Sequence, residues 1–341
     1  MPGWSWERLF QRATEEAVLP ALAGAVTDGL DISATREVSD VLTAILSLNR
    51  ERNQRIWRDL RTTVQLLNEV GVEPVLLKGA AYLAAGVYSD LGTRYLLDLD
   101  LLVPERQLNM AFQRLVENGY LYDQADQFGR FRHHYPPLRR ASVPIELHYK
   151  LGLGPCVSIL PAKEVVENAA PIELDGFRVR LPSPTHLVTH LVMHSQVQHP
   201  YNERIWPPLR VMYDLLRLQC QYRDSIDWAE VNSRFKSARQ IGVLQLHLID
   251  VRDTLGVDLP IDCRLAPTTR LRGLRRRTLR KFPLLRYLDP IYMFSAVCIR
   301  RLRVLRNVLA APGGVKRFLI QLFAPGTFER IFLDVMEGRG R

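Results

Sequence analysis

Two aspartates, Asp98 and Asp100, stand one residue apart in the stretch LLDLDLLV. The alternation of polar and apolar residues predicts a β-strand, on which both carboxylates would point to one face. The leucines between and beside them, Leu97, Leu99 and Leu101, would point into the core. Neighbouring carboxylates repel each other and raise one pKa, and Mg²⁺ or Mn²⁺ removes that repulsion by binding their hard oxygens. The spacing therefore indicates a metal site, and a solvent-facing edge strand is the alternative.

A third carboxylate is available in a second alternating segment, SVPIELHYKL. Glu146 and His148 fall two residues apart there, and hence on one face of a strand. Three acidic groups from neighbouring strands suit a two-metal centre, in which one ion activates the attacking oxygen and the other steadies the leaving phosphate. We therefore take Asp98, Asp100 and Glu146 as candidate catalytic and metal-binding residues.

The segment LLKGAA changes from an apolar strand pattern to a helical pattern at Lys78 and Gly79. A glycine at that point lets the backbone approach a phosphate closely, and the amides that begin a helix favour negative charge. Lys78 would add a point charge to a triphosphate, and Arg94 would add a planar fork of donors. The alternatives are a simple tight turn at Gly79 and a surface cation at Arg94.

The hydrophobic periodicity outlines the elements that must hold these residues. Helical spacing of apolar residues from Ser33 to Val70 predicts one long helix or two short ones, ended by Gly71. Strands and helices then alternate. The predicted strands are EPVLLKG, LLDLDLLV, YLYDQADQFGRFRHHYPPL with a turn at Gly129, and SVPIELHYKL, and the predicted helices are AAYLAAGVY and PERQLNMAFQRLVENG.

The rest of the sequence and the chain length indicate the fold class. Asp175-Gly176 in PIELDGFRVRLPS is a two-residue hairpin signal, and beyond Ser183 the pattern is helical. A chain of 341 residues exceeds the ~250–300 residues that one core supports. We expect an α+β protein in which a small mixed-sheet core follows a helical segment and precedes a mostly helical lobe. The expected domains are 1–72, 73–183 and 184–341, the last with a basic tail.

The motifs together resemble a known family. LLKGAAYL, the arginine four residues ahead of DLDLLV, the helix ending in Gly-Tyr and PIELHYKL resemble the uncharacterised nucleotidyltransferase family, a divergent branch of the polymerase-beta-like superfamily. Weaker likeness extends to HLVTHLVMH and RVMYDLLRL, so the resemblance covers about half to two thirds of the chain.

The resemblance implies roles for individual residues. Asp98 and Asp100 would hold the metal ions, with Glu146 as the third carboxylate, and Lys78 with Gly79 would meet the nucleotide phosphates. Ala80 stands where the superfamily has serine or glycine, so a hydroxyl contact to phosphate is absent, and the stretch between Gly79 and Asp98 is longer than in the superfamily. Ala80, Arg94 and His148 complete the nucleotide-binding candidates.

Histidines form a second pattern. His186, His190 and His194 fall at four-residue spacing on one helical face, without the adjacent glutamate of a zinc protease. We expect structural or substrate-lining roles for them. By the resemblance alone, His194 and Arg210 would face the nucleotide cleft. His133 and His134 could touch an acidic substrate, with an exposed strand as the alternative.

The formal charge of +10 is concentrated in the arginines between Arg264 and Arg317. It favours an acidic partner or an anionic membrane surface, with a solvated basic face as the alternative. No segment has the ~20 apolar residues that a transmembrane helix needs. The four separated cysteines and the absence of a signal-peptide pattern predict a cytoplasmic protein.

Three functions fit these features. The first is transfer of a nucleoside monophosphate from a nucleoside triphosphate such as ATP to an acceptor hydroxyl, with release of pyrophosphate. The second keeps this chemistry with a protein, peptide or RNA acceptor, and the third is a catalytically degenerate module that binds a nucleotide or a partner. The chain has no G-x-x-x-x-G-K-[ST] phosphate loop, and no G-x-G-x-x-G follows a strand.

Overall fold

The computed structural model describes residues 5–30, 34–123, 133–140, 142–199, 204–260, 265–289 and 292. The chain divides into two compact units, residues 1–269 and 270–341. All candidate site residues lie in the first unit.

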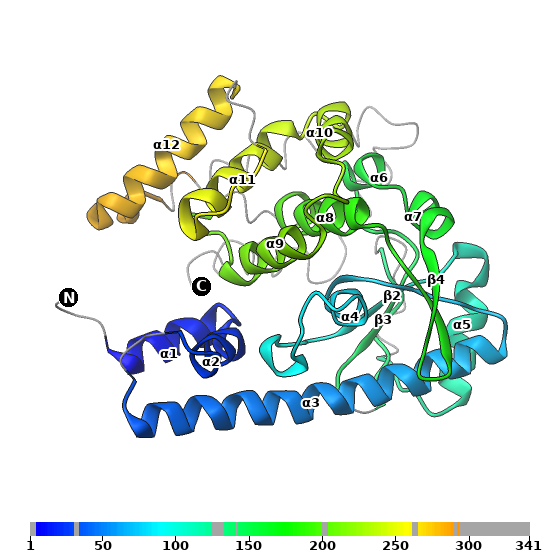
Figure 1. Cartoon of the computed structure of the whole chain (residues 1–341). Coiled ribbons are helices and arrows are strands. Elements are labelled where there is room, and N and C mark those ends of the chain that lie inside the picture. Colours follow the sequence, from blue (N-terminus) through cyan, green and yellow to red (C-terminus); the bar gives the residue numbers. More distant parts are fainter. Residues whose placement is uncertain are drawn as a thin grey trace. The chain divides into compact units, whose positions relative to one another are not determined.

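The first unit begins with three helices, α1 (Trp6–Glu15), α2 (Leu19–Thr27) and α3 (Arg36–Glu69). The periodicity left open one helix or two, and α3 is a single helix of 34 residues. The Thr35 side chain caps its first turn, and Gly71 beyond its end has a φ of +74°, which glycine adopts without strain. Figure 1 shows α3 as the long blue helix, which contacts α2 in its first half and the sheet in its second.

A five-stranded mixed sheet forms the centre of this unit, and it confirms the predicted fold class. Its strands are β1 (Val75–Leu76), β2 (Leu99–Leu102), β3 (Ile145–His148), β4 (Ala170–Leu174) and β5 (Phe177–Leu181), in the order β3-β2-β1-β5-β4. β2 and β3 are parallel, as are β1 and β5, and the other two pairs are antiparallel. Asp175 and Gly176 both have positive φ at the β4–β5 turn, as the hairpin signal predicted.

Helices pack against this sheet and continue beyond it. Short helices are α4 (Lys78–Ala84), the 3-10 turn η1 (Leu91–Thr93), α6 (Cys156–Ile159) and α7 (Ala162–Asn168). Longer ones are α5 (Glu105–Glu117), α8 (Pro184–Val192), α9 (Leu209–Tyr222), α10 (Trp228–Ser237) and α11 (Ile241–Leu255). A π-helix, Met193–Gln198, continues α8 directly. The predicted helical half is confirmed in this part of the chain.

Two details of the sequence prediction need correction. β2 begins at Leu99, so Asp98 immediately precedes the strand, and Leu97 is exposed where the alternation had placed it in the core. The long segment before β3 contributes isolated bridges in its described part, among them Leu138 with Ile145, and no named strand. The turn predicted at Gly129 lies outside the described residues.

Two asparagines of α3 hold the chain that leads into β2. The Asn53 side-chain amide donates to the carbonyl oxygens of Leu91 (2.5 Å) and Arg94 (2.7 Å), and Asn49 donates to those of Gly92 (2.7 Å) and Arg94 (3.1 Å). Both side chains are buried. These bonds fix the entry to the strand that carries the candidate carboxylates.

Substitution of Asn53 by alanine is expected to lower the free energy of unfolding by about 1–3 kcal/mol, because two carbonyl groups lose a donor. Urea denaturation measures the loss. The exposed neighbour Gln54 is the matched control on the same helix, and its replacement by alanine should change stability by less than about 0.5 kcal/mol. Equal effects at the two positions would contradict the role of Asn53.

Candidate functional site

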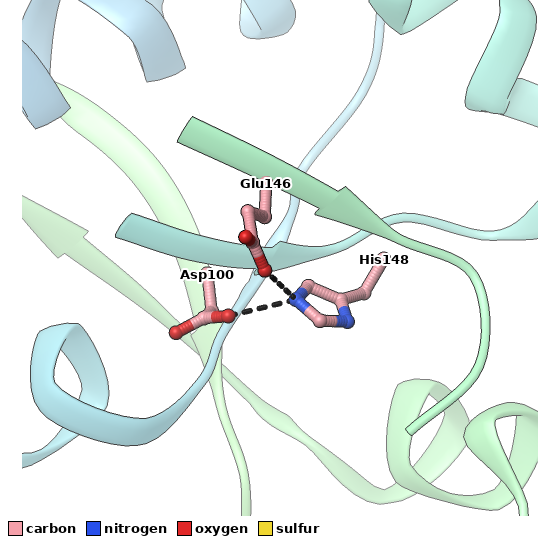
Figure 2. Close-up of side chains that lie close together, drawn as sticks. All are labelled: Asp100, Glu146 and His148. Carbon is pink, nitrogen blue, oxygen red and sulfur yellow. Dashed lines mark hydrogen bonds and ion pairs between the residues drawn. The ribbon is translucent and has the colours of Figure 1, made fainter. Parts of the chain in front are cut away.

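The parallel pairing of β2 with β3 brings two carboxylates and a histidine together. Asp100 is the register partner of Glu146, and His148 follows two residues later on β3. Nε2 of His148 lies 2.7 Å from Oδ1 of Asp100 and 3.3 Å from Oε2 of Glu146, as Figure 2 shows. Candidate ligand atoms of the three residues lie within 4.8 Å of one another. This is a set of donors that a divalent cation can use.

Lys78 contacts the carboxylate of Asp100 as well. Its Nζ lies 2.7 Å from Oδ1 of Asp100, the oxygen that also contacts His148. Burial alone would raise the pKa of Asp100, but Lys78 and His148 hold it well below its usual range. Burial alone would likewise lower the pKa of His148, and its bonds to Asp100 and Glu146 raise it instead. Lys78 and His148 therefore balance part of the negative charge of Asp100. From the sequence we had expected a metal ion alone to balance it.

The backbone of Lys78 is strained. Its φ is +47°, in the left-handed region that residues other than glycine seldom adopt. Such strain commonly marks functional sites, where the surrounding structure over-determines an unfavourable conformation. Here it occurs at the first residue of α4, and the Lys78 ammonium contacts Asp100.

Aspartate 98 lies at the edge of this cluster and is not one of its members. Burial and the neighbouring charge of Asp100 raise the pKa of Asp98 to about 6. Among the described residues no cation forms a salt bridge with it. The carboxylates of Asp98 and Asp100 together offer oxygen ligands that suit Mg²⁺ or Mn²⁺.

Close packing accounts for a glycine at position 79. A Cβ on Gly79 would lie 2.4 Å from Cδ2 of Leu96 and 2.5 Å from Nη1 of Arg94. Both neighbours are buried, so a side chain is excluded there whether or not a phosphate approaches. Ala80, the next residue, is buried within α4.

Arginine 94 is a buried cation, which excludes the alternative of a surface charge. Its Nε and Nη2 each donate at 2.9 Å to one carboxylate oxygen of Asp214 on α9. The Tyr88 hydroxyl donates to the same carboxylate at 2.5 Å. The fork predicted for phosphate is therefore occupied by Asp214, although Arg94 also lines the cavity described next.

One cavity of about 360 Å³ connects most of the predicted residues. It is lined by Lys78, Gly79, Arg94, Asp98, Glu146, His194 and Arg210 among others. Ala80, Asp100 and His148 are buried beside it and do not line it. The structure thus gathers ten residues chosen from sequence into one small region, seven of them on the cavity wall.

Further side chains line the same cavity. Three of them are histidines that the sequence pattern had already singled out: His190 from α8, His133 and His134. Ser195 from the π-helix and His199 just after it also line the cavity, and they were not predicted because a π-helix has no sequence signal. π-Helical turns are rare and often occur at functional sites.

His186 does not line the cavity, unlike His190 and His194. Its Nε2 lies 3.6 Å from Glu164, in a cluster that also contains Glu230. The Arg234 guanidinium bridges Glu164 and Glu230. The negative charge of this second acidic group is thus met by an arginine, which makes it an ion-pair network.

Histidine 190 should give the fold a measurable pH dependence. Burial and the nearby charge of Lys78 lower its pKa from 6.5 to about 3. The unfolded chain therefore binds a proton near pH 6.5 that the folded chain refuses until about pH 3, so stability falls as pH drops through that window. The expected contribution is up to about 1.4 kcal/mol per pH unit.

Urea denaturation between pH 7.5 and pH 5 measures this effect. His190→Gln has no titrating group at the position, so its stability should fall less steeply below pH 6.5 than that of the wild type. Above pH 7 the two slopes should coincide. Parallel curves throughout would show that His190 titrates normally in the folded protein.

The chain is similar to known proteins. The family described as "Uncharacterised nucleotidyltransferase" matches residues 2–249. No curated protein matches the chain. Among solved structures, the crystal structure of an antigenic nucleotidyltransferase-like protein from Paracoccidioides brasiliensis matches at 15% identity with a TM-score of 0.33, over 64% of this chain and 94% of that chain.

Proposed function

This chain belongs to the uncharacterised nucleotidyltransferase family, and on that premise we propose that it transfers a nucleoside monophosphate from a nucleoside triphosphate to an acceptor hydroxyl in a metal-dependent reaction. One observation carries the proposal. The parallel register of β2 and β3 sets Asp100 beside Glu146, and Asp98 and Glu146 share a cavity with Lys78 and Gly79.

The carboxylates would hold the metal ions. Bound by Asp98, Asp100 and Glu146, Mg²⁺ or Mn²⁺ would activate the attacking oxygen and neutralise charge on the leaving pyrophosphate. Lys78 would bind triphosphate oxygens, since it lines the cavity beside Gly79. His148 would orient Asp100 and Glu146 through the Nε2 atom that contacts both.

The reaction also needs a base. The acceptor oxygen forms a bond to the α-phosphorus, the bond from that phosphorus to the bridging oxygen breaks, and pyrophosphate leaves with that electron pair. The acceptor proton passes to a group of the protein. Glu146 is one candidate, and the second is His194, whose pKa is held well below its usual range by burial and by Lys78, so that the ring is neutral at pH 7.

A non-catalytic module is the second candidate. It is favoured by the contact of Lys78 with Asp100, which already balances part of the negative charge, and by Ala80 in place of a phosphate-binding serine. In that case a nucleotide or a partner would bind the cavity without turnover. A protein, peptide or RNA acceptor is a variant of the first candidate with the same chemistry.

Calorimetry separates the two candidates. Each of the four ribonucleoside triphosphates is titrated, with and without Mg²⁺, into wild type, the Asp98→Asn/Asp100→Asn double variant and the control Glu117→Gln, which changes an exposed carboxylate on α5. Binding that requires Mg²⁺ and is lost only in the double variant is expected. Absence of metal-dependent binding by folded wild type would remove the enzymatic proposal.

A further inference from the structure

The helix that begins at the end of the first unit and runs into the second is strongly basic. α12 (Pro267–Lys281) leads into a 3-10 helix, Pro283–Leu288, and residues 265–288 contain eight arginines and lysines and no acidic residue. The next residue, Asp289, is bound by Arg275. The segment therefore carries a large net positive charge.

Exposed leucines lie among these cations. Leu271 is 67% exposed and Leu274 is 58% exposed, one turn apart on α12. Arg270, Arg277 and Lys281 are exposed at matching helical spacing, so one face combines apolar and cationic side chains. This differs from the alternative in which the apolar stripe packs inward and the arginines alone face solvent.

The residues that follow α12 also expose apolar side chains. Phe282 is 51% exposed, Leu284 is 80% exposed and Tyr287 is 82% exposed. Aromatic side chains with a polar tip or edge suit the boundary between water and lipid. Such a group of exposed apolar side chains marks an interaction surface.

The chemistry of the surface selects its partner. A nucleic acid would bind the cations through phosphate and leave Leu271 and Leu274 in water. An anionic bilayer binds the cations at its headgroups and takes up the leucines below them. No described helix is long and apolar enough to cross a membrane.

We propose that the surface formed by Arg270, Leu271, Leu274, Arg277 and Lys281 binds an anionic lipid membrane. The helix lies in the plane of the interface with its leucines in the acyl boundary. This binding is independent of the chemistry in the cavity of the first unit.

Flotation of the full-length chain with lipid vesicles tests the proposal. Vesicles of phosphatidylcholine alone are compared with vesicles of phosphatidylcholine and phosphatidylglycerol in equal parts. Binding to the anionic vesicles only, weakened by salt, is expected. Arg270→Gln/Arg277→Gln/Lys281→Gln should reduce partitioning on the order of 100-fold, since each charge contributes about a factor of five.

The leucines give the decisive comparison. Leu271→Ser/Leu274→Ser should reduce partitioning at least about tenfold, because apolar burial supplies part of the binding. Leu48→Ser/Leu121→Ser is the matched control, since both leucines are exposed in the first unit, and it should bind like wild type. A labelled single-stranded RNA is titrated in parallel.

Several outcomes would overturn the proposal. Unchanged vesicle binding by Leu271→Ser/Leu274→Ser would show an unspecific polycation that does not enter lipid. RNA binding without vesicle binding would assign the surface to nucleic acid. Binding to neither would leave a solvated basic face.

Discussion

Asp98→Asn is expected to remove metal-dependent turnover while leaving the protein at least as stable as wild type. The carboxylate is a proposed metal ligand, and metal ions contribute several kcal/mol to transition-state stabilisation. A loss of at least about a thousandfold follows, since each 1.36 kcal/mol is a factor of ten. Stability should hold because the raised pKa of Asp98 shows that its charge is unfavourable in the folded state.

Asp100→Asn should cause the same functional loss with the opposite effect on stability. The Asp100 carboxylate accepts a hydrogen bond from Lys78 Nζ and contacts His148 Nε2, both at 2.7 Å. Burial alone would raise the pKa of Asp100, but these two contacts hold it well below its usual range. A neutral amide leaves Lys78 without its charge partner. The free energy of unfolding should fall by about 1–3 kcal/mol.

The two variants are compared by release of pyrophosphate from the triphosphate that wild type binds, and by urea denaturation at pH 7. Glu117→Gln serves as the control in both assays. Full turnover in Asp98→Asn would remove that residue from the metal site. Equal destabilisation in both variants would contradict the different surroundings of the two carboxylates.

The sequence made the sheet positions of Asp100 and Glu146 predictable because strand alternation determines which residues share a face. It also located Lys78 and Gly79 at the transition from β1 to α4. The Lys78–Asp100 contact was not predictable, since it depends on a backbone conformation with positive φ that lysine rarely adopts.

The sequence also did not predict contacts between residues that are far apart in the chain. Arg94 precedes Asp98 by four residues, and that spacing suggested a role at the phosphates. Its bidentate partner, Asp214, is 120 residues away on α9, where nothing in the local pattern marks it as the acceptor. The helix α3 likewise holds η1 through Asn49 and Asn53, whose polar character in a helix gave no hint of their acceptors.

Arg94→Ala is expected to lower the free energy of unfolding by about 3–5 kcal/mol, and Asp214→Ala by a similar amount. Removing one partner of a buried ion pair leaves the other charge without compensation. Both side chains are nearly fully buried, and Tyr88 adds a hydrogen bond to Asp214. Arg94→Lys should also destabilise, because an ammonium group cannot make two parallel bonds to one carboxylate.

The chain contains a matched control for this prediction. Arg50 and Asp90 also form a bidentate pair, at 2.9 Å and 2.6 Å, but their side chains are 41% and 30% exposed. Arg50→Ala should therefore cost less than about 1 kcal/mol, since water screens the pair and solvates the remaining charge. Equal urea midpoints for Arg50→Ala and Arg94→Ala would contradict the argument from burial.

Nucleotide binding distinguishes a structural arginine from a phosphate ligand at position 94. If Arg94 serves the fold through Asp214, the two alanine variants should lose stability together, and each should bind nucleotide as well as wild type under conditions where it remains folded. If Arg94 binds phosphate directly, Arg94→Ala alone should lose affinity. Its guanidinium already has both oxygens of Asp214 as acceptors at 2.9 Å, so a phosphate would have to compete with a buried carboxylate. We therefore expect the stability effect to dominate.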